Sequence, residues 1–139
     1  MDKLIGHRAI LDSVSELFQE MSKEGGRPVS IAVVDSHADL LHFTRLDGAP
    51  ERSILLASNK AYTAARWGRD SVELAKMLAE GNRELSWYGD SRLTAIGGGV
   101  VIRDKQKNCI GAVGVSGRTM EEDMALASRV AGKVAAKAA

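Results

Sequence analysis

The sequence predicts an α+β fold in which the elements follow one another in the order α-β-β-α-α-β-β-α. Two β-branched runs, residues 29–34 and 98–104, are each followed by a polar turn and a second strand-like run. Segments with apolar residues at helical spacing flank these hairpins, at residues 8–23, 51–67 and 119–138. The repeated unit is therefore an antiparallel hairpin followed by a helix.

The first predicted helix, residues 8–23, carries an apolar face. That face consists of Leu11, Val14, Leu17, Phe18 and Met21. Gly25 and Gly26 end the helix, and Pro28 prevents its return. The strand at 29–34 then follows.

Residues 35–39, Asp-Ser-His-Ala-Asp, form the predicted turn of the first hairpin, and residues 40–46 form its second strand. Side chains alternate across a strand, so His42 and Thr44 are expected on one side. The other side carries Leu41, Phe43 and Arg45.

Pro50 suits the first turn of the second helix, residues 51–67. Its inward stripe is expected to contain mainly small residues, which allow close packing: Ile54, Ala57, Ala61, Ala64 and Ala65. Asp70 and Glu73 form a capping-box pattern for a third helix, which Gly81 ends. Residues 82–96 show no clear pattern, and a short strand or a turn at 92–96 stays open.

The second hairpin runs through residues 98–104, a polar turn at 105–108, and residues 109–117. Gly111 and Gly114 fall on opposite faces of its second strand. Glycine inside a strand marks a bulge or the close approach of another backbone or of a ligand. Thr119 and Glu122 predict the cap of the last helix.

Composition excludes several classes of function. The 139 residues are expected to form one domain, residues 1–139, because no linker-like stretch divides them. A net charge of +1 and no basic stripe argue against nucleic acid as a partner. No segment has the length of a membrane span or the apolar core of a secretory signal, which predicts a cytoplasmic protein. The lone Cys109 is expected to be a buried, inert thiol.

Two kinds of site are disfavoured by the pattern. The glycines at 97–99 open a strand, whereas a dinucleotide fingerprint needs a glycine turn that opens a helix. The start of the last helix could hold an anion, but Glu121, Glu122 and Asp123 would repel a phosphate. The histidines match no zinc-binding spacing, so no metal site is predicted.

Three segments together resemble the GlcG/HbpS-like (DUF336) family and the C-terminal domain of PduO-type corrinoid adenosyltransferases. They are PVSIAVVDSHADLLHFTRLDGAPERSILLASNKAYTAA, GGGVVI and IGAVGVSGRTMEED. The resemblance runs from about Leu11 to Val130. It implies a profilin-like, antiparallel, roughly five-stranded sheet with helices on both faces, and a symmetric homo-oligomer. Several members of the family bind haem.

The chain departs from the family pattern in three places. The first hairpin turn lacks the usual glycine, and a valine, Val100 or Val101 depending on register, replaces the usual proline after the glycines. Gly117-Arg118 stands where the family has paired glycines, which adds a cation. No Cys-x-x-Cys-His motif is present, so haem would be held noncovalently. The axial candidates are His7, His37, His42 and the methionines.

The favoured hypothesis is a small-ligand-binding or haem-binding oligomeric domain. Its ligand is expected in space opened by Gly98, Gly99 and Gly111, near Thr119. One of the three histidines would be the axial ligand if that ligand is haem.

A second hypothesis is a cofactor-free enzyme for a small carboxylate or carbonyl substrate of a catabolic pathway. Asp35 or Asp47 would act as acid or base, Arg45 would pair with the carboxylate, and Lys60 would serve as a charge clamp. The plainer interpretation of Lys60 is a solvated side chain. A third hypothesis is an accessory subunit whose apolar helix faces build an oligomer.

Overall fold

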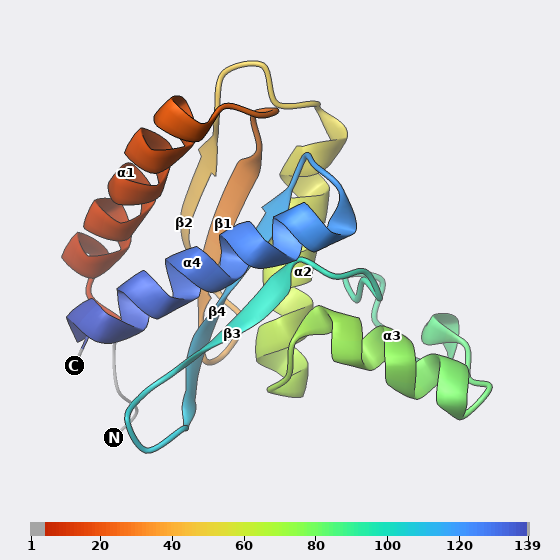
Figure 1. Cartoon of the computed structure of the whole chain (residues 1–139). Helices are drawn as coiled ribbons and strands as arrows, with labels where there is room; N and C mark the ends of the chain where they lie inside the picture. Colours follow the sequence, from red (N-terminus) through yellow and green to blue (C-terminus); the bar gives the residue numbers. More distant parts are fainter. Residues whose placement is uncertain (1–4, 139) are drawn as a thin grey trace.

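The computed structural model describes residues 5–138. Its elements confirm the predicted order and add one 3₁₀-helix in the unassigned segment (Figure 1). They are α1 (His7–Glu24), β1 (Ser30–Asp35), β2 (Leu40–Arg45), α2 (Arg52–Trp67), α3 (Ser71–Glu80), η1 (Leu85–Tyr88), β3 (Gly99–Arg103), β4 (Cys109–Ser116) and α4 (Met120–Ala138).

The described residues form a four-stranded sheet in the order β2-β1-β4-β3, and every neighbouring pair is antiparallel. The expectation of roughly five strands is therefore wrong. Residues 92–96 add no strand, because their backbone bonds to a helix instead of a sheet edge. The Thr94 N–H donates to Thr63 Oγ1 of α2 at 2.8 Å.

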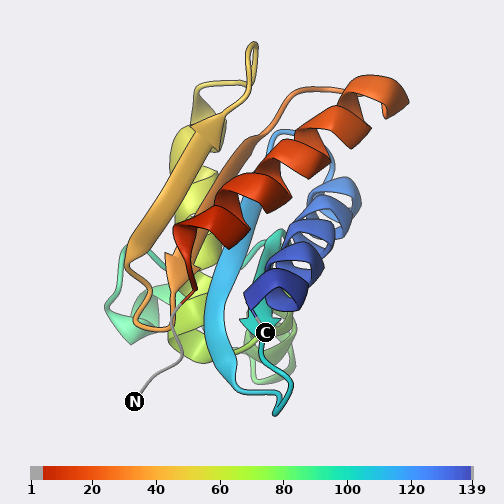
Figure 2. The ribbon, with the colours of Figure 1, turned by 90° about the vertical axis from the view of Figure 1, so that its left-hand side faces the viewer.

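Helices cover both faces of the sheet. In Figure 2, α1 and α4 lie on one face and α2 lies on the other. Ile31 and Val33 of β1 belong to the apolar cluster shared with α1 and α4. Ala32 and Val34 alternate with them and pack with the alanines of α2. The sheet thus has a bulky core on the α1/α4 face and a small-residue core on the α2 face.

Glycines let the sheet and α2 approach each other closely. A Cβ atom added at Gly114 of β4 would collide with the carbonyl oxygen of Ala57, and one at Gly99 of β3 would collide with that of Lys60. Both obstacles are helix backbone, which cannot rotate away. The glycines are therefore packing residues for α2.

Helix α1 covers its side of the sheet incompletely. Val14, Leu17 and Met21 are buried as predicted, whereas Leu11 is 49% exposed and Phe18 is 50% exposed. The helix packs mainly against α4 and contacts β2 only slightly. The side of its apolar stripe that faces β2 is therefore left partly exposed. Ile54 of α2 is also not part of the inward stripe, since it is 40% exposed.

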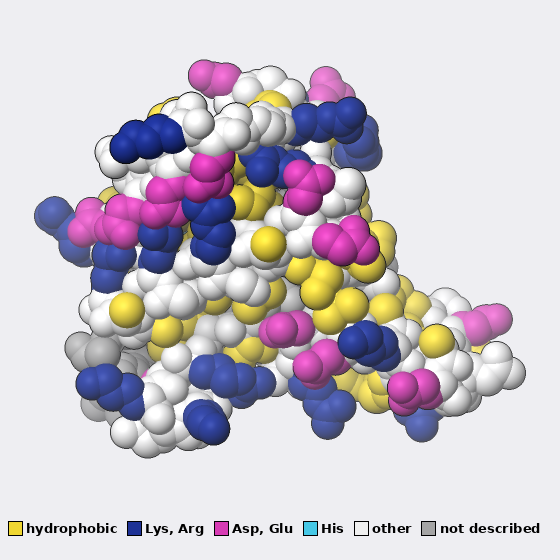
Figure 3. Space-filling view, viewed as in Figure 1, with side chains coloured by type: hydrophobic (Ala, Val, Ile, Leu, Met, Phe, Trp, Pro, Cys, Tyr) yellow, Lys and Arg dark blue, Asp and Glu magenta, His cyan; other side chains and the backbone are white. Residues whose placement is uncertain are grey.

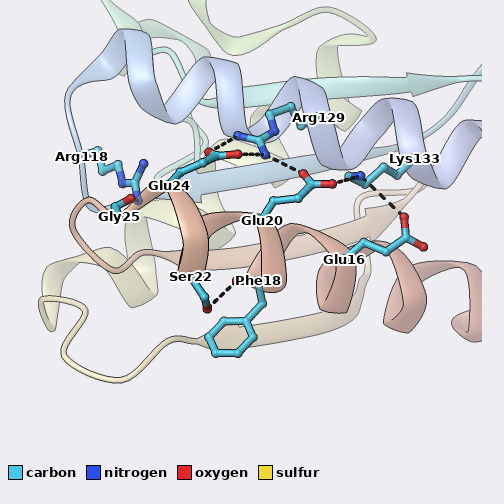
Figure 4. A network of polar contacts seen from close by, with 9 residues as sticks. All are labelled: Glu16, Phe18, Glu20, Ser22, Glu24, Gly25, Arg118, Arg129 and Lys133. Carbon is cyan, nitrogen blue, oxygen red and sulfur yellow. Dashed lines mark hydrogen bonds and ion pairs between the residues drawn. The ribbon is translucent and has the colours of Figure 1, made fainter.

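A row of ion pairs joins α1 to α4 (Figures 3 and 4). Arg129 contacts Glu20 at 2.6 Å and Glu24 at 2.9 Å, and Lys133 contacts Glu20 at 2.7 Å. Glu16 continues the row with Lys133 and Lys137. These cations lower the pKa of all three glutamates, mainly through direct hydrogen bonds.

We predict that this row makes the domain less stable in acid. The pKa of Glu20 is lower in the folded state, so its stabilising contribution is complete above the unfolded pKa, near 4.5, and is lost as pH falls through the lowered value. Glu20→Gln should reduce the melting temperature at pH 7 but have no effect at a pH where the wild-type carboxylates are protonated. An equal deficit at both pH values would show that the charge does not stabilise the fold.

The two predicted helix caps had different outcomes. Thr119 Oγ1 accepts the N–H of Glu122 at 3.2 Å, which confirms the cap of α4. The Asp70–Glu73 capping box is not formed. The Asp70 carboxylate instead accepts the N–H of Val101 at 3.0 Å and so ties the start of α3 to β3.

No helix among the described residues has the length and apolar character to cross a membrane.

Candidate functional site

A hollow of about 400 Å³ lies between α1 and the edge strand β2. This volume is within the usual range for small-molecule sites. The hollow is lined by Leu11, Val14, Ser15, Phe18, His42, Thr44, Arg45, Leu46 and Asp47. We call it the α1–β2 groove.

The alternation of side chains along β2 determines which of its polar groups face the groove. His42 pairs across the sheet with Val33, and Thr44 pairs with Ile31. Both partners belong to the α1/α4 core, so His42 and Thr44 also face α1. Leu11 and Phe18, one to each side of the buried turn of α1, provide the opposite apolar wall.

His42 is the titratable group best placed for ligand chemistry in the groove. Burial lowers the pKa of its imidazole, which keeps the ring neutral at pH 7. Its Nε2 lies 2.6 Å from Thr44 Oγ1. When Nε2–H donates to that oxygen, Nδ1 carries the lone pair that a metal ion needs.

The other histidines lie outside the groove. His7 is exposed in the first turn of α1, and His37 is exposed in the β1–β2 turn. The backbone N–H of His37 donates to Asp35 Oδ1 at 2.8 Å, and the N–H of Asp39 donates to the same oxygen. Asp35 therefore uses its carboxylate to stabilise the β1–β2 turn, which lacks the glycine usual in the family.

The candidate catalytic residues do not converge. Arg45 and Asp47 line the α1–β2 groove, but Arg45 donates through Nε and Nη2 to the carbonyl of Ala49. Asp35 is committed to the hairpin turn, and Lys60 belongs to α2 on the other face of the sheet. The described residues also hold no group of three or more His, Cys, Asp or Glu side chains suited to a metal ion.

Lys60 is buried, contrary to the solvated interpretation. Its side chain is 3% exposed, and Nζ contacts Asp123 Oδ2 at 3.2 Å and the carbonyl of Val115 at 3.0 Å. Asp123 also accepts the N–H of Arg118 at 3.0 Å. Burial raises the pKa of the Asp123 carboxyl, and Lys60 and the backbone donors oppose that rise.

This pair also bears on the start of α4, where the sequence left an anion site possible but disfavoured. The protein's own carboxylate, Asp123, occupies the backbone donor after β4 that an anion would use. Thr119, predicted beside a cofactor, uses its hydroxyl to cap α4.

The expectation of vacant space beside the glycines is wrong. Next to Gly98 lie the carbonyl of Val115 and the side chain of Lys60, and next to Gly111 lies the carbonyl of Val34. Gly99 faces the α2 backbone as described above. The protein fills these positions itself.

Cys109 is half-buried rather than fully buried, with Sγ 3.5 Å from the carbonyl of Gly111.

Sequence reasoning missed the apolar members of the groove. The helical spacing predicts Phe18 and Leu11 on the buried face of α1, and the sequence indicates no site role for Thr44 or Leu46. The available signal was the pairing of His42 with Thr44 on one side of a strand next to an apolar helix stripe. That signal does not show how far the helix stands from the strand.

The sheet, its two helical layers and the groove define a small α+β domain with room for a ligand on its α1 side. The chain belongs to the HbpS-like family: the family described as "Haem degrading protein HbpS-like" matches residues 8–131. This match confirms the resemblance that the sequence motifs indicate.

Individual relatives agree with this assignment. Protein GlcG of Escherichia coli K12 is 32% identical over 115 residues, which cover 82% of this chain and 83% of GlcG. A crystal structure of a double mutant of Streptomyces reticuli HbpS has a TM-score of 0.82 at 28% identity, covering 95% of this chain and 88% of that one. A PduOC–haem complex has a TM-score of 0.75 at 25% identity, covering 91% and 89%.

Proposed function

We propose that this chain binds haem noncovalently in the α1–β2 groove, with His42 as the axial ligand. The observation that carries the proposal is a half-buried histidine on the wall of a largely apolar hollow of suitable size. Among the three histidines, only His42 lies in that hollow.

The residues of the groove fit such a group. Leu11, Val14 and Phe18 offer apolar surface to a ring system, and Phe18 is half exposed. The Thr44 hydroxyl fixes the orientation of the imidazole through its hydrogen bond with Nε2. Haem, when bound, would supply an iron centre for redox or gas-binding chemistry.

Two of the comparisons support haem over other flat apolar ligands. The family carries the description of a haem-degrading protein, and PduOC has been solved with haem. For the cofactor-free enzyme, by contrast, the candidate groups are dispersed over both faces of the sheet.

We also propose that the protein is a homo-oligomer, since large apolar side chains such as Leu55 and Trp87 are 67% and 65% exposed.

Titration of the purified protein with hemin, followed by its Soret absorption, tests the proposal. We expect a saturable Soret shift in the wild type and a loss of affinity of at least about tenfold in His42→Ala, because the axial ligand is gone. His37→Ala and His7→Ala are matched controls that remove a histidine outside the groove, and both should bind as the wild type does. A spectrum that survives His42→Ala but disappears in either control would place the ligand elsewhere.

A further inference from the structure

A second hollow, of about 210 Å³, adjoins the α1–β2 groove. The two hollows share Phe18, Leu46 and Asp47 as wall residues, so they lie next to each other. The second hollow ends at Gly26 and Arg118, where the α1–β1 loop meets the turn between β4 and α4. Figure 4 shows Arg118 beside Gly25 at the end of α1.

The Arg118 guanidinium forms the cationic wall of this hollow. It lies directly over Gly26, where an added Cβ would come within 2.6 Å of Nη2. Nε donates to the carbonyl of Arg27 at 2.7 Å, and Nη2 donates to that of Gly25 at 3.1 Å. These bonds fix the plane of the group but use only part of its donors, since a guanidinium carries five N–H groups.

Among the described residues, no carboxylate forms an ion pair with Arg118. The nearby Glu24 is engaged by Arg129 through both of its oxygens, at 3.0 and 2.9 Å. Asp47 lines the hollow but lies outside ion-pair distance of Arg118. The contrast with the α1–α4 row is informative, because there each cation, Arg129, Lys133 and Lys137, has a glutamate partner.

We infer that Arg118 binds a carboxylate of the ligand whose apolar body occupies the α1–β2 groove. The site then selects tetrapyrroles with free carboxylates over their esters. A fixed guanidinium with unused N–H groups matches a carboxylate in geometry and charge. This inference rests on the proposed function and adds the residue that would determine ligand specificity.

The test compares metal-free protoporphyrin IX with its dimethyl ester, using porphyrin fluorescence to measure both affinities. The wild type is expected to bind the free acid about 10- to 100-fold more tightly than the ester, since a hydrogen bond to a charged group contributes that much. Arg118→Gln should remove most of this difference while leaving the affinity for the ester unchanged. Lys23→Gln is the matched control, because it removes the same charge from the exposed last turn of α1.

The outcomes separate the two claims. Equal binding of acid and ester by the wild type would overturn the role of Arg118 and leave the haem proposal standing. An equal reduction of the acid preference by Lys23→Gln would overturn it too, because the effect would then be long-range charge. Failure of both porphyrins to bind the wild type would count against the groove itself. If circular dichroism shows that Arg118→Gln does not fold, Arg118→Lys and the comparison of acid with ester in the wild type still test the role of Arg118.

Discussion

Lys60→Met is expected to destabilise the domain by about 3–5 kcal/mol, the range for removing one partner of a buried ion pair. The substitution leaves the Asp123 carboxylate buried among Arg118 N–H and apolar groups without its countercharge. It also removes the donor to the carbonyl of Val115. Urea denaturation, with the midpoint and slope compared with the wild type, measures the loss.

A second substitution, Asp123→Asn, shows whether charge pairing accounts for the loss of stability. Its effect on stability should have opposite signs in the wild-type and Lys60→Met backgrounds. Asp123→Asn keeps an acceptor for the Arg118 N–H but removes the negative charge. In the wild-type background it should destabilise, because Lys60 loses its countercharge. In the Lys60→Met background it should restore part of the stability, because no unpaired charge remains buried. Destabilisation in both backgrounds would mean that packing, and not charge pairing, accounts for the loss.

A surface pair supplies the comparison. Lys137 pairs with Glu16, and the two side chains are 29% and 44% exposed, against 3% for each side chain of the Lys60–Asp123 pair. Lys137→Met should therefore change the free energy of unfolding by less than about 1 kcal/mol. A loss as large as that of Lys60→Met would contradict the distinction between buried and exposed pairs.

Gly114→Ala is expected to cost about 3 kcal/mol or more, the upper part of the range for overpacking. The new methyl group would meet the carbonyl of Ala57 and come within 2.6 Å of the N–H nitrogen of Ala61. Both belong to the α2 backbone, so the whole helix must shift. Thermal and urea unfolding of the variant measure the cost.

Gly132→Ala is the matched control, with the same change of residue type at a position in α4 where nothing lies within 4 Å of the added Cβ. It should stabilise the protein by roughly 0.5–1 kcal/mol, because alanine is the better helix former. A neutral Gly114→Ala would show that space remains between β4 and α2, and would reopen the idea of a ligand beside the glycines.

The hairpins and helices could be predicted because their signals are local. Each of these signals depends only on residues that are close in the sequence. Examples are the β-branched runs, the Gly25-Gly26 helix end and the Thr119–Glu122 cap. The fifth strand was an expectation from the family resemblance. The backbone of Thr94 bonds to a side chain of α2 instead, and that choice depends on tertiary packing.

The candidate site was harder to predict because it depends on distances between elements. Glycines in strands indicate close approach, but the pattern does not say whether a ligand or a helix approaches. For Gly99 and Gly114 the answer is α2. Similarly, Lys60 looks like a solvated residue in its own helix, and only the fold brings Asp123 to it from α4. Phe18 has the spacing of a core residue but extends past the edge of the sheet.

The most direct measurement is a crystal structure of the protein grown with hemin, in which anomalous scattering locates the iron. The account predicts an iron peak next to the His42 imidazole, between α1 and β2. A peak at His7 or His37, or beside Gly98 and Gly111 with α2 displaced, would contradict it.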